Sequence, residues 1–192
     1  GYRNDVQVIL TALSADQENY LDILAIIGAS TALTISDVPF AGPVGAVRVG
    51  HVDGEYVFNP TAMQMEHSIL DLRMSGTEDA ILMVEAGAHE VPEDMILEAR
   101  QQGHREMQKI IQLQKRMAAE LGKPKRTFVP ALPSDEVRAA VDLRLGDRLA
   151  EIVRSALSKE ERNAALRALR QELATDLEET LDPREVKAVF DD

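Results

Sequence analysis

Two stretches carry most of the fold information in this chain of 192 residues: Gly28–Phe40 has the sequence GASTALTISDVPF, and Leu70–Ile81 has the sequence LDLRMSGTEDAI. The first continues an apolar series that begins at Ile23. We therefore expect a helix over about 23–36, capped by Asp22 and buried on most sides. The second stretch alternates apolar and polar residues over 69–74, as a half-buried strand does. It then turns at 76–79 into another expected strand over 80–86.

Further strands and one long helix flank these stretches. The apolar run over 6–13 is typical of a buried strand. The segments 46–49 and 56–58 enclose an Asp-Gly pair at 53–54, which is a strong hairpin signal. Pro92 and the two acidic residues after it mark the start of a long helix that runs to Gly122. Residues 1–126 therefore predict an α+β arrangement in the order β-α-β-β-β-β-α.

The remainder of the chain is predicted to be helical. Three prolines within 123–133 indicate a linker. Ser134 precedes one expected helix, Ser158 and Glu161 form a capping box before a second, and Asp182 followed by a proline opens a third. We expect two domains, 1–126 and an all-helical 127–192 that is truncated at its C-terminal end. The abrupt start in a buried strand also predicts either a piece of a longer polypeptide or a chain that needs a partner piece, because the sheet would otherwise expose strand edges.

Charge and composition narrow the class of protein. The net charge is −12, but it is unevenly spread: residues 1–99 hold 3 basic and 16 acidic groups, whereas residues 100–126 hold 8 basic and 2 acidic groups. An acidic surface repels nucleic acid, so any contact with RNA must use the basic stretch or a partner segment. The chain has no cysteine and no apolar run of membrane-spanning length, and we expect a cytoplasmic protein with no membrane partner.

Several segments together resemble a known family. With the two stretches above, GYRNDVQV at 1–8, LSADQE at 13–18 and GPVG at 42–45 resemble bacterial polynucleotide phosphorylases. Residues 1–126 look like the second half of the first RNase PH-like (ribosomal protein S5 domain 2-like) domain, and 127–192 take the place of the all-helical connector domain. The resemblance implies a homotrimeric ring, which shortens single-stranded RNA from its 3′ end with inorganic phosphate and releases nucleoside diphosphates. It also implies Mg²⁺ or Mn²⁺ as cofactor and partners in an RNA-degradation assembly.

The resemblance also locates positions where an active copy of the domain binds phosphate. In the active copy a serine-rich turn precedes the Gly-Ala-Ser helix segment, and counting back from Gly28 reaches Tyr20, Leu21 and Asp22. Two bulky side chains and a carboxylate replace small hydroxyls there. A like-charge contact at 4 Å costs about 1 kcal/mol even when well screened, so phosphate binding at this turn is not expected.

The metal-binding positions are altered in the same way. The active copy uses two aspartates and a lysine, and their places here fall at Met65, Asp71 and Arg73. A thioether is a poor ligand for a hard cation, and arginine is a different donor from lysine. We call Tyr20, Leu21, Asp22, Met65, Asp71 and Arg73 the relic positions. We assign no catalytic, cofactor-binding or metal-binding residue to this segment, and we expect the metal and phosphate of the full enzyme to bind outside it.

Two other functions are kept open. The chain could be a separately made, non-enzymatic interaction module, or an independently active RNase PH-like enzyme. The relic positions argue against the second. The four histidines, His51, His67, His89 and His104, lack metal-ligand spacing and are interpreted as ordinary polar residues. The basic run over 115–126 is interpreted mainly as a solvated helix end, with an approach to RNA as the alternative.

Overall fold

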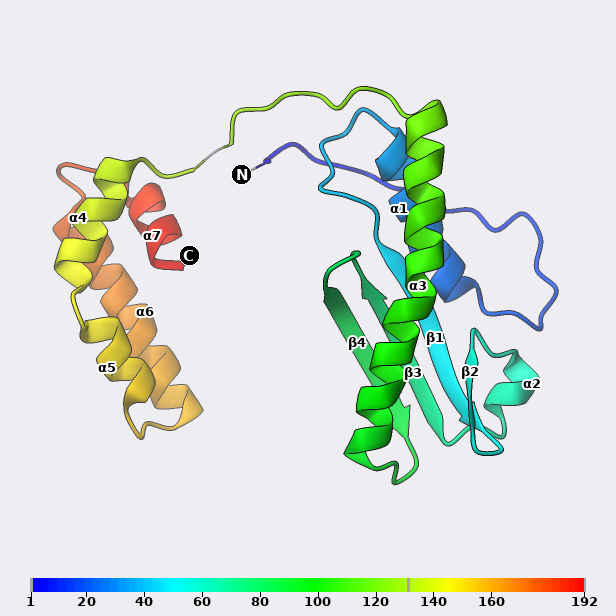
Figure 1. The fold of residues 1–192 in the computed structure, drawn as a ribbon. Coiled ribbons are helices and arrows are strands. Elements are labelled where there is room, and N and C mark those ends of the chain that lie inside the picture. Colours follow the sequence, from blue (N-terminus) through cyan, green and yellow to red (C-terminus); the bar gives the residue numbers. More distant parts are fainter. Residues whose placement is uncertain (1, 131, 192) are drawn as a thin grey trace. The chain divides into compact units, whose positions relative to one another are not determined.

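The computed structural model describes residues 2–130 and 132–191. Its contacts divide the chain into two compact units, one formed by Asn4–Phe128 and one built mainly from the residues that follow. The first unit is an α+β structure and the second is helical (Figure 1). The assignment of these units to the two domains of the resembled family stays a prediction.

The first unit is centred on a four-stranded antiparallel sheet with the order β2-β1-β3-β4. The expected hairpin is present: β1 (Gly45–Val52) and β2 (Glu55–Phe58) are joined through Asp53 and Gly54, which both have positive φ angles of 51° and 88°. The second decisive stretch forms β3 (Leu70–Gly76) and β4 (Ile81–Ala88), as predicted. A short helix that the sequence analysis did not anticipate, α2 (Ala62–Met65), starts with a capping box between Thr61 and Gln64.

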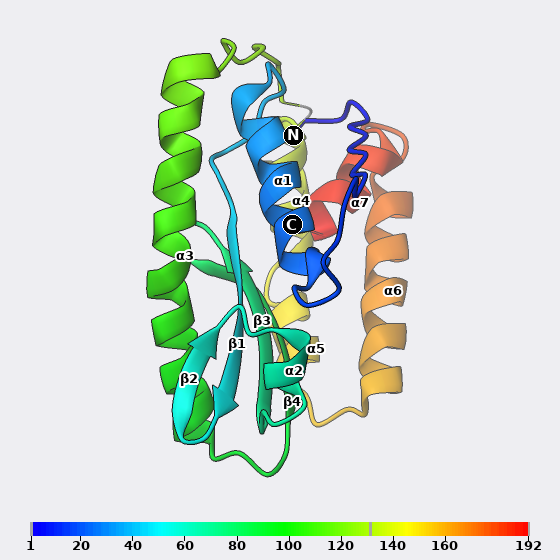
Figure 2. The ribbon, with the colours of Figure 1, turned by 90° about the vertical axis from the view of Figure 1, so that its right-hand side faces the viewer.

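The long helix α3 (Glu93–Leu121) packs across one face of the sheet (Figures 1 and 2). Strand alternation turns Val47 and Val49 of β1 and Leu72 and Met74 of β3 toward it, and these side chains form the core with Ala99, Met107 and Ile111. Gly103 lets the helix approach closely. A Cβ atom at this position would lie 2.6 Å from the Met74 sulfur and 3.0 Å from a Val49 methyl group.

Helix α1 (Leu21–Ile35) lies beside the half of α3 that contains its C-terminus (Figure 2). A buried polar network joins the two helices to the start of β1. The Ser30 hydroxyl donates to Gln114 Oε1 at 2.7 Å and accepts from the Val44 amide at 2.8 Å, while Gln114 Nε2 donates to the Val44 carbonyl at 2.9 Å. All three groups are satisfied, so the network fixes the mutual position of α1, α3 and β1.

Three expectations for the N-terminal part are wrong. Residues 6–13 form neither a strand nor a helix, and their apolar side chains are exposed. None of the strands within the described residues pairs with them. Helix α1 begins at Leu21, so Asp22 stands in its first turn and Tyr20 is the N-cap residue. The helix is also less buried than expected: Leu24 is 58% exposed, and only Ile23, Ser30 and Thr34 are buried.

The segment after α3 is tied back to α1. Lys125 Nζ donates to the carbonyls of Leu33, Thr34 and Ser36, which stand at the C-terminal end of α1. A cation is favoured there because the helix dipole and the free carbonyl groups place negative charge at this end. Arg126 adds an ion pair to Asp37 at 2.7 Å. These basic residues of the expected linker therefore stabilise the fold of the first unit.

The second unit contains four helices: α4 (Asp135–Leu145), α5 (Arg148–Arg154), α6 (Lys159–Asp176) and α7 (Pro183–Asp191). The predicted Ser158–Glu161 capping box is confirmed, and Pro183 is the first residue of α7. The buried side chains of this unit come from α4, α6 and α7 and from the residue that follows α6: Val137, Val141, Leu169, Leu173, Ala174, Leu177 and Val186.

Candidate functional site

The sheet face opposite α3 carries charged side chains. In β1 and β3, the residues between the core positions are Arg48, Asp71 and Arg73. The register places Arg48 directly opposite Arg73, and Gly50 opposite Asp71. Two like charges that face each other across a strand pair destabilise the pair, so this arrangement needs compensating carboxylates.

Asp71 supplies the main compensation. Both of its carboxylate oxygens accept hydrogen bonds from Arg48, from Nε and from the terminal Nη2, each at 2.7 Å. This two-point geometry is the strongest form of an arginine–carboxylate pair. Arg48 is only 5% exposed, and its guanidinium also stacks on the Tyr20 ring, 3.8 Å from the ring centre. The cation is therefore enclosed by a carboxylate and an aromatic face.

Arg73 and Asp22 complete what we call the ion-pair cluster, Asp22, Arg48, Asp71 and Arg73. Arg73 donates to Asp71 at 3.0 Å and lies 3.7 Å from Asp22, and Arg48 lies 3.9 Å from the same Asp22 carboxylate. Glu85 of β4 is a further neighbour of Arg73, at 3.6 Å. The cluster holds two cations and two anions, so its charges balance.

The cluster holds its groups in their charged forms. Burial raises the pKa of Asp71, but the hydrogen bonds and charges of Arg48 and Arg73 outweigh burial, so the pKa lies below its ordinary value. Burial likewise lowers the pKa of Arg48, and Asp71 reverses this effect and raises it above its ordinary value. Both shifts favour a permanent ion pair at neutral pH.

The structure brings the relic positions together. A hollow of about 490 Å³ is lined by Tyr20, Arg48, Met65, Asp71 and, among others, Glu66. Leu21 lines a neighbouring, more apolar hollow of about 440 Å³ that shares Tyr20 and Arg48 with the first. Asp22 and Arg73 join through the ion-pair cluster. Segments far apart in the sequence, 20–22, 65 and 71–73, thus meet on one side of the sheet.

Arg48 is the central residue of this site, and the sequence analysis did not single it out. The only available signal was a charged residue inside the apolar sequence AVRV of an expected strand. A charged side chain in such a place is seldom buried unless it is paired, and that rule alone predicts a carboxylate partner on the neighbouring strand.

The residues at this site do not fit a divalent metal ion. Both oxygens of Asp71 are already hydrogen-bonded to arginine, and Met65 offers only a thioether. Two guanidinium groups occupy the surroundings of the one retained carboxylate and would repel a cation. Among the described residues, no group of three or more His, Asp and Glu side chains is arranged to hold a metal ion.

The site does not fit inorganic phosphate either. Asp22 stands in the first turn of α1, where free backbone N–H groups would otherwise attract an anion, and its own carboxylate accepts from the Ile23 amide at 2.8 Å. The arginines nearby are already balanced by carboxylates. The arrangement is therefore a charge-neutral cluster in which both arginines pair with carboxylates; the buried Arg73 Nε has no hydrogen-bond partner and faces Asp22 at 3.7 Å.

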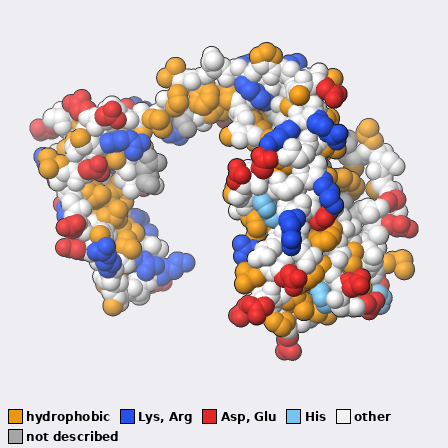
Figure 3. Space-filling model, viewed as in Figure 1, with side chains coloured by type: hydrophobic (Ala, Val, Ile, Leu, Met, Phe, Trp, Pro, Cys, Tyr) orange, Lys and Arg blue, Asp and Glu red, His pale blue; other side chains and the backbone are white. Residues whose placement is uncertain are grey.

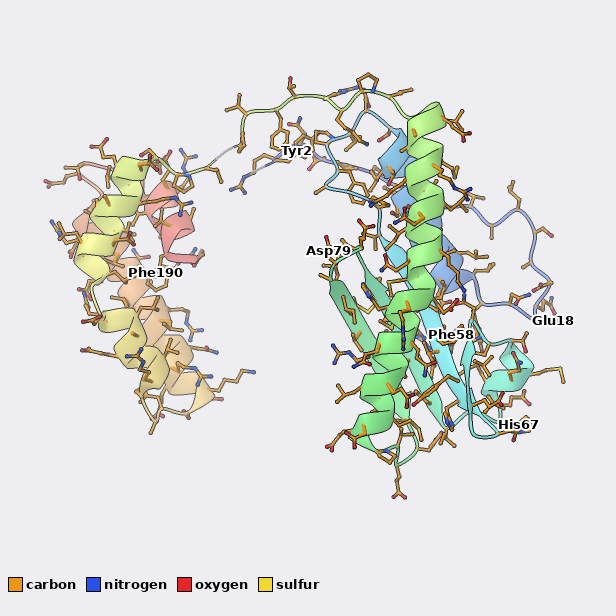
Figure 4. All side chains as sticks on the ribbon, viewed as in Figure 1. Tyr2, Glu18, Phe58, His67, Asp79 and Phe190 are labelled. Atoms are coloured by element: carbon orange, nitrogen blue, oxygen red, sulfur yellow. The ribbon has the colours of Figure 1, made fainter. Side chains whose placement is uncertain are left out.

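Two of the histidines make ordinary hydrogen-bond and packing contacts. His104 Nε2 lies 3.0 Å from the Thr77 carbonyl, and the His51 ring packs edge-on against Tyr56 with ring centres 5.1 Å apart. His67 directly follows α2, and its amide donates to the Gln64 carbonyl at 3.2 Å (Figure 4). Within the part of the chain that the structure describes, no helix combines the length and apolar character needed to cross a membrane.

Comparison with known proteins agrees with this architecture. Residues 42–106 match the 3′ exoribonuclease family, domain 2. A polyribonucleotide nucleotidyltransferase from Thermomicrobium roseum is 52% identical over 173 residues, which make up 90% of this chain and 22% of that protein. Another from Thermus thermophilus is 49% identical over 168 residues, 86% of this chain and 23% of that protein. A third from Roseiflexus castenholzii is 45% identical over 100% of this chain and 26% of that protein. The chain thus spans about a quarter of the length of these relatives.

Proposed function

We propose that this chain is the non-catalytic part of a phosphorolytic exoribonuclease. The ground is its membership of the polyribonucleotide nucleotidyltransferase family over the segment that it shares with those relatives. In the full-length protein, inorganic phosphate would attack the 3′-terminal phosphodiester of RNA. The bond from phosphorus to the 3′ oxygen of the preceding nucleotide breaks, and a nucleoside diphosphate leaves. This chemistry takes place in another domain.

The observation that carries this proposal is the ion-pair cluster. Three of the positions that hold metal and phosphate in an active RNase PH-like domain, Asp22, Asp71 and Arg73, are here joined with Arg48 by ion pairs. Two of these contacts are 2.7 Å hydrogen bonds from Arg48 to Asp71. A site whose charges already balance has no electrostatic stabilisation left for a transition state. The segment instead supplies a rigid sheet and helices that support ring assembly and the RNA channel.

The remaining parts of the proposal concern the full-length protein. We propose a cytoplasmic homotrimer that binds single-stranded RNA, uses Mg²⁺ or Mn²⁺ bound outside this segment, and meets partners of an RNA-degradation assembly. The support for these points is the similarity to the relatives across nearly the whole chain.

Two assays test the proposal. Residues 1–192 alone, incubated with oligoadenylate, phosphate and Mg²⁺, should release no nucleoside diphosphate. The full-length protein should release it, and replacement of Tyr20, Leu21 and Asp22 by serine should leave its rate unchanged. Serine-to-alanine changes in the corresponding turn of the second RNase PH-like domain serve as the control and should abolish release. Activity of 1–192 alone, or a large rate change in the triple-serine variant, would contradict the assignment.

A further inference from the structure

A row of polar and basic side chains lies along the exposed face of α3. Gln101, Arg105, Lys109, Gln112 and Arg116 follow one another at steps of three or four residues, which places them on one side of the helix. All five are exposed or nearly so, and none is apolar. At 1.5 Å per residue the row is about 22 Å long. Figure 3 shows Lys and Arg side chains gathered along this helix.

The cations of this α3 basic row, Arg105, Lys109 and Arg116, are available to a ligand. Other basic residues of this region are used inside the fold, because Lys115 pairs with Glu78, and Lys125 and Arg126 hold the end of α1. Among the described residues, neither Arg105 nor Arg116 forms an ion pair with a carboxylate. Lys109 touches Glu106 at 2.6 Å, but its side chain is 73% exposed.

A hollow lies at one end of the row. It measures about 550 Å³ and is lined by Asp79 and Ile81 near the β3–β4 turn and by Arg100, Gln101, His104 and Arg105 of α3. Figure 4 shows Asp79 at this turn, beside the helix. Arg100 Nε is buried in the protein and has no hydrogen-bond partner. The hollow therefore adds a further cation, Arg100, at the end of the row, and Arg100 has an unused hydrogen-bond donor. Asp79 is the one carboxylate that lines the hollow.

We propose that the α3 basic row binds the phosphate backbone of single-stranded RNA, with one phosphate entering the hollow beside Arg100. The proposal rests on the proposed function, since that function makes RNA the polyanion that this protein meets. Residues 1–99 carry a net charge of −13, from 3 basic and 16 acidic groups, and would repel RNA. A cationic track along α3 overcomes this repulsion locally. The five residues of the row are all polar or charged, and the exposed Leu113 stands at its edge, which favours RNA over a protein partner.

The test is the salt dependence of RNA binding by the full-length protein. Affinity for a fluorescently labelled oligoadenylate is measured between 50 and 400 mM KCl for the wild type and for the triple variant R105Q/K109Q/R116Q. Each lost phosphate contact lowers the slope of log Kd against log salt by about 0.7, so we expect a decrease of about 2. At 100 mM KCl the same relation predicts a loss of affinity of roughly 100-fold.

Two control variants separate charge from other effects. R154Q/K159Q/R167Q removes the same charges from exposed positions of the second unit and should leave the slope unchanged. R105K/K109R/R116K keeps the charges and should retain the wild-type slope. The proposal would be overturned if the triple glutamine variant kept the wild-type slope, whether or not its affinity fell. A change in oligomeric state without a change in slope would overturn it as well.

The basic row rests on the proposed function, but the two proposals fail by different results. Release of nucleoside diphosphate by the wild-type full-length protein is measured in parallel. Absence of phosphorolysis in the wild-type protein would reject the proposed function, whereas an unchanged binding slope would reject only the basic row.

Discussion

Replacement of Arg48 by methionine tests the ion-pair cluster directly. The substitution removes two hydrogen bonds to Asp71 of 2.7 Å each and the stack on Tyr20, and it leaves the Asp71 carboxylate with Arg73 as its remaining partner. Breaking a fully buried pair from one side costs about 3–5 kcal/mol. The Asp71 side chain is 27% exposed and keeps one partner, so we expect the lower end, about 3 kcal/mol.

Hydrogen exchange in the full-length protein measures this cost locally. Peptides that cover β1 and β3 should exchange on the order of 100-fold faster in Arg48→Met, since each 1.4 kcal/mol is worth about a factor of ten. Peptides from α6 should not change. In the double variant R48M/D71L no carboxylate is left facing the missing Arg48, and Arg73 keeps Asp22 and Glu85 at 3.7 and 3.6 Å, so most of the protection should return.

The reasoning is refuted if Arg48→Met changes the opening free energy of β1 and β3 by less than about 0.5 kcal/mol, a size typical of exposed pairs. It is also refuted if the double variant is as unstable as the two single variants added together. Either result would mean that Arg48 and Asp71 are solvated independently and that the cluster does not hold the site closed.

Three further outcomes follow from the packing and charge of the first unit. Ser30→Ala should lower the opening free energy of β1, measured by hydrogen exchange, by about 1–3 kcal/mol, because the Val44 amide and Gln114 lose their buried partner. Thr31→Ala is the control, since the Thr31 hydroxyl bonds only within α1. Gly103→Ala should lower stability by about 1–3 kcal/mol through overpacking against Met74, whereas Gly87→Ala, with its nearest neighbour at 3.9 Å, should have no comparable effect. The pKa of Asp71 is lower in the folded protein than in the unfolded chain, where it is about 4. The carboxylate therefore stabilises the folded state above about pH 4, and this stabilisation is lost as the pH falls through the folded pKa. Thermal unfolding measured from pH 6 to pH 2 should show this loss in the wild type and not in Asp71→Asn.

Local sequence patterns predicted the elements whose contacts are also local. The Asp-Gly turn, the alternation over 69–74 and the Ser158–Glu161 capping box each predicted an element that the structure confirms. These signals work because turn geometry, strand alternation and helix capping depend on residues within a few positions of one another.

The errors arise where a distant partner decides the outcome. Residues 6–13 have strand composition, but a strand forms only beside another strand, and none lies there. Asp22 looked like a helix cap, whereas Tyr20 precedes the helix and stacks on Arg48 of β1. Arg48 itself became meaningful only when the register of β1 and β3 placed it near Asp71. The resemblance named the relic positions, but only the three-dimensional contacts show that the charged ones, Asp22, Asp71 and Arg73, are neutralised together with Arg48.

The stack of Tyr20 on Arg48 gives the protein a built-in optical probe. The chain has no tryptophan and only three tyrosines, so the near-ultraviolet spectrum of this segment is dominated by very few rings. One of them, Tyr20, is 37% exposed, and its ring centre lies 3.8 Å from the buried Arg48 guanidinium. The circular dichroism band of that ring therefore reports on the cluster without any label, and its loss would reveal opening of the site before the sheet unfolds.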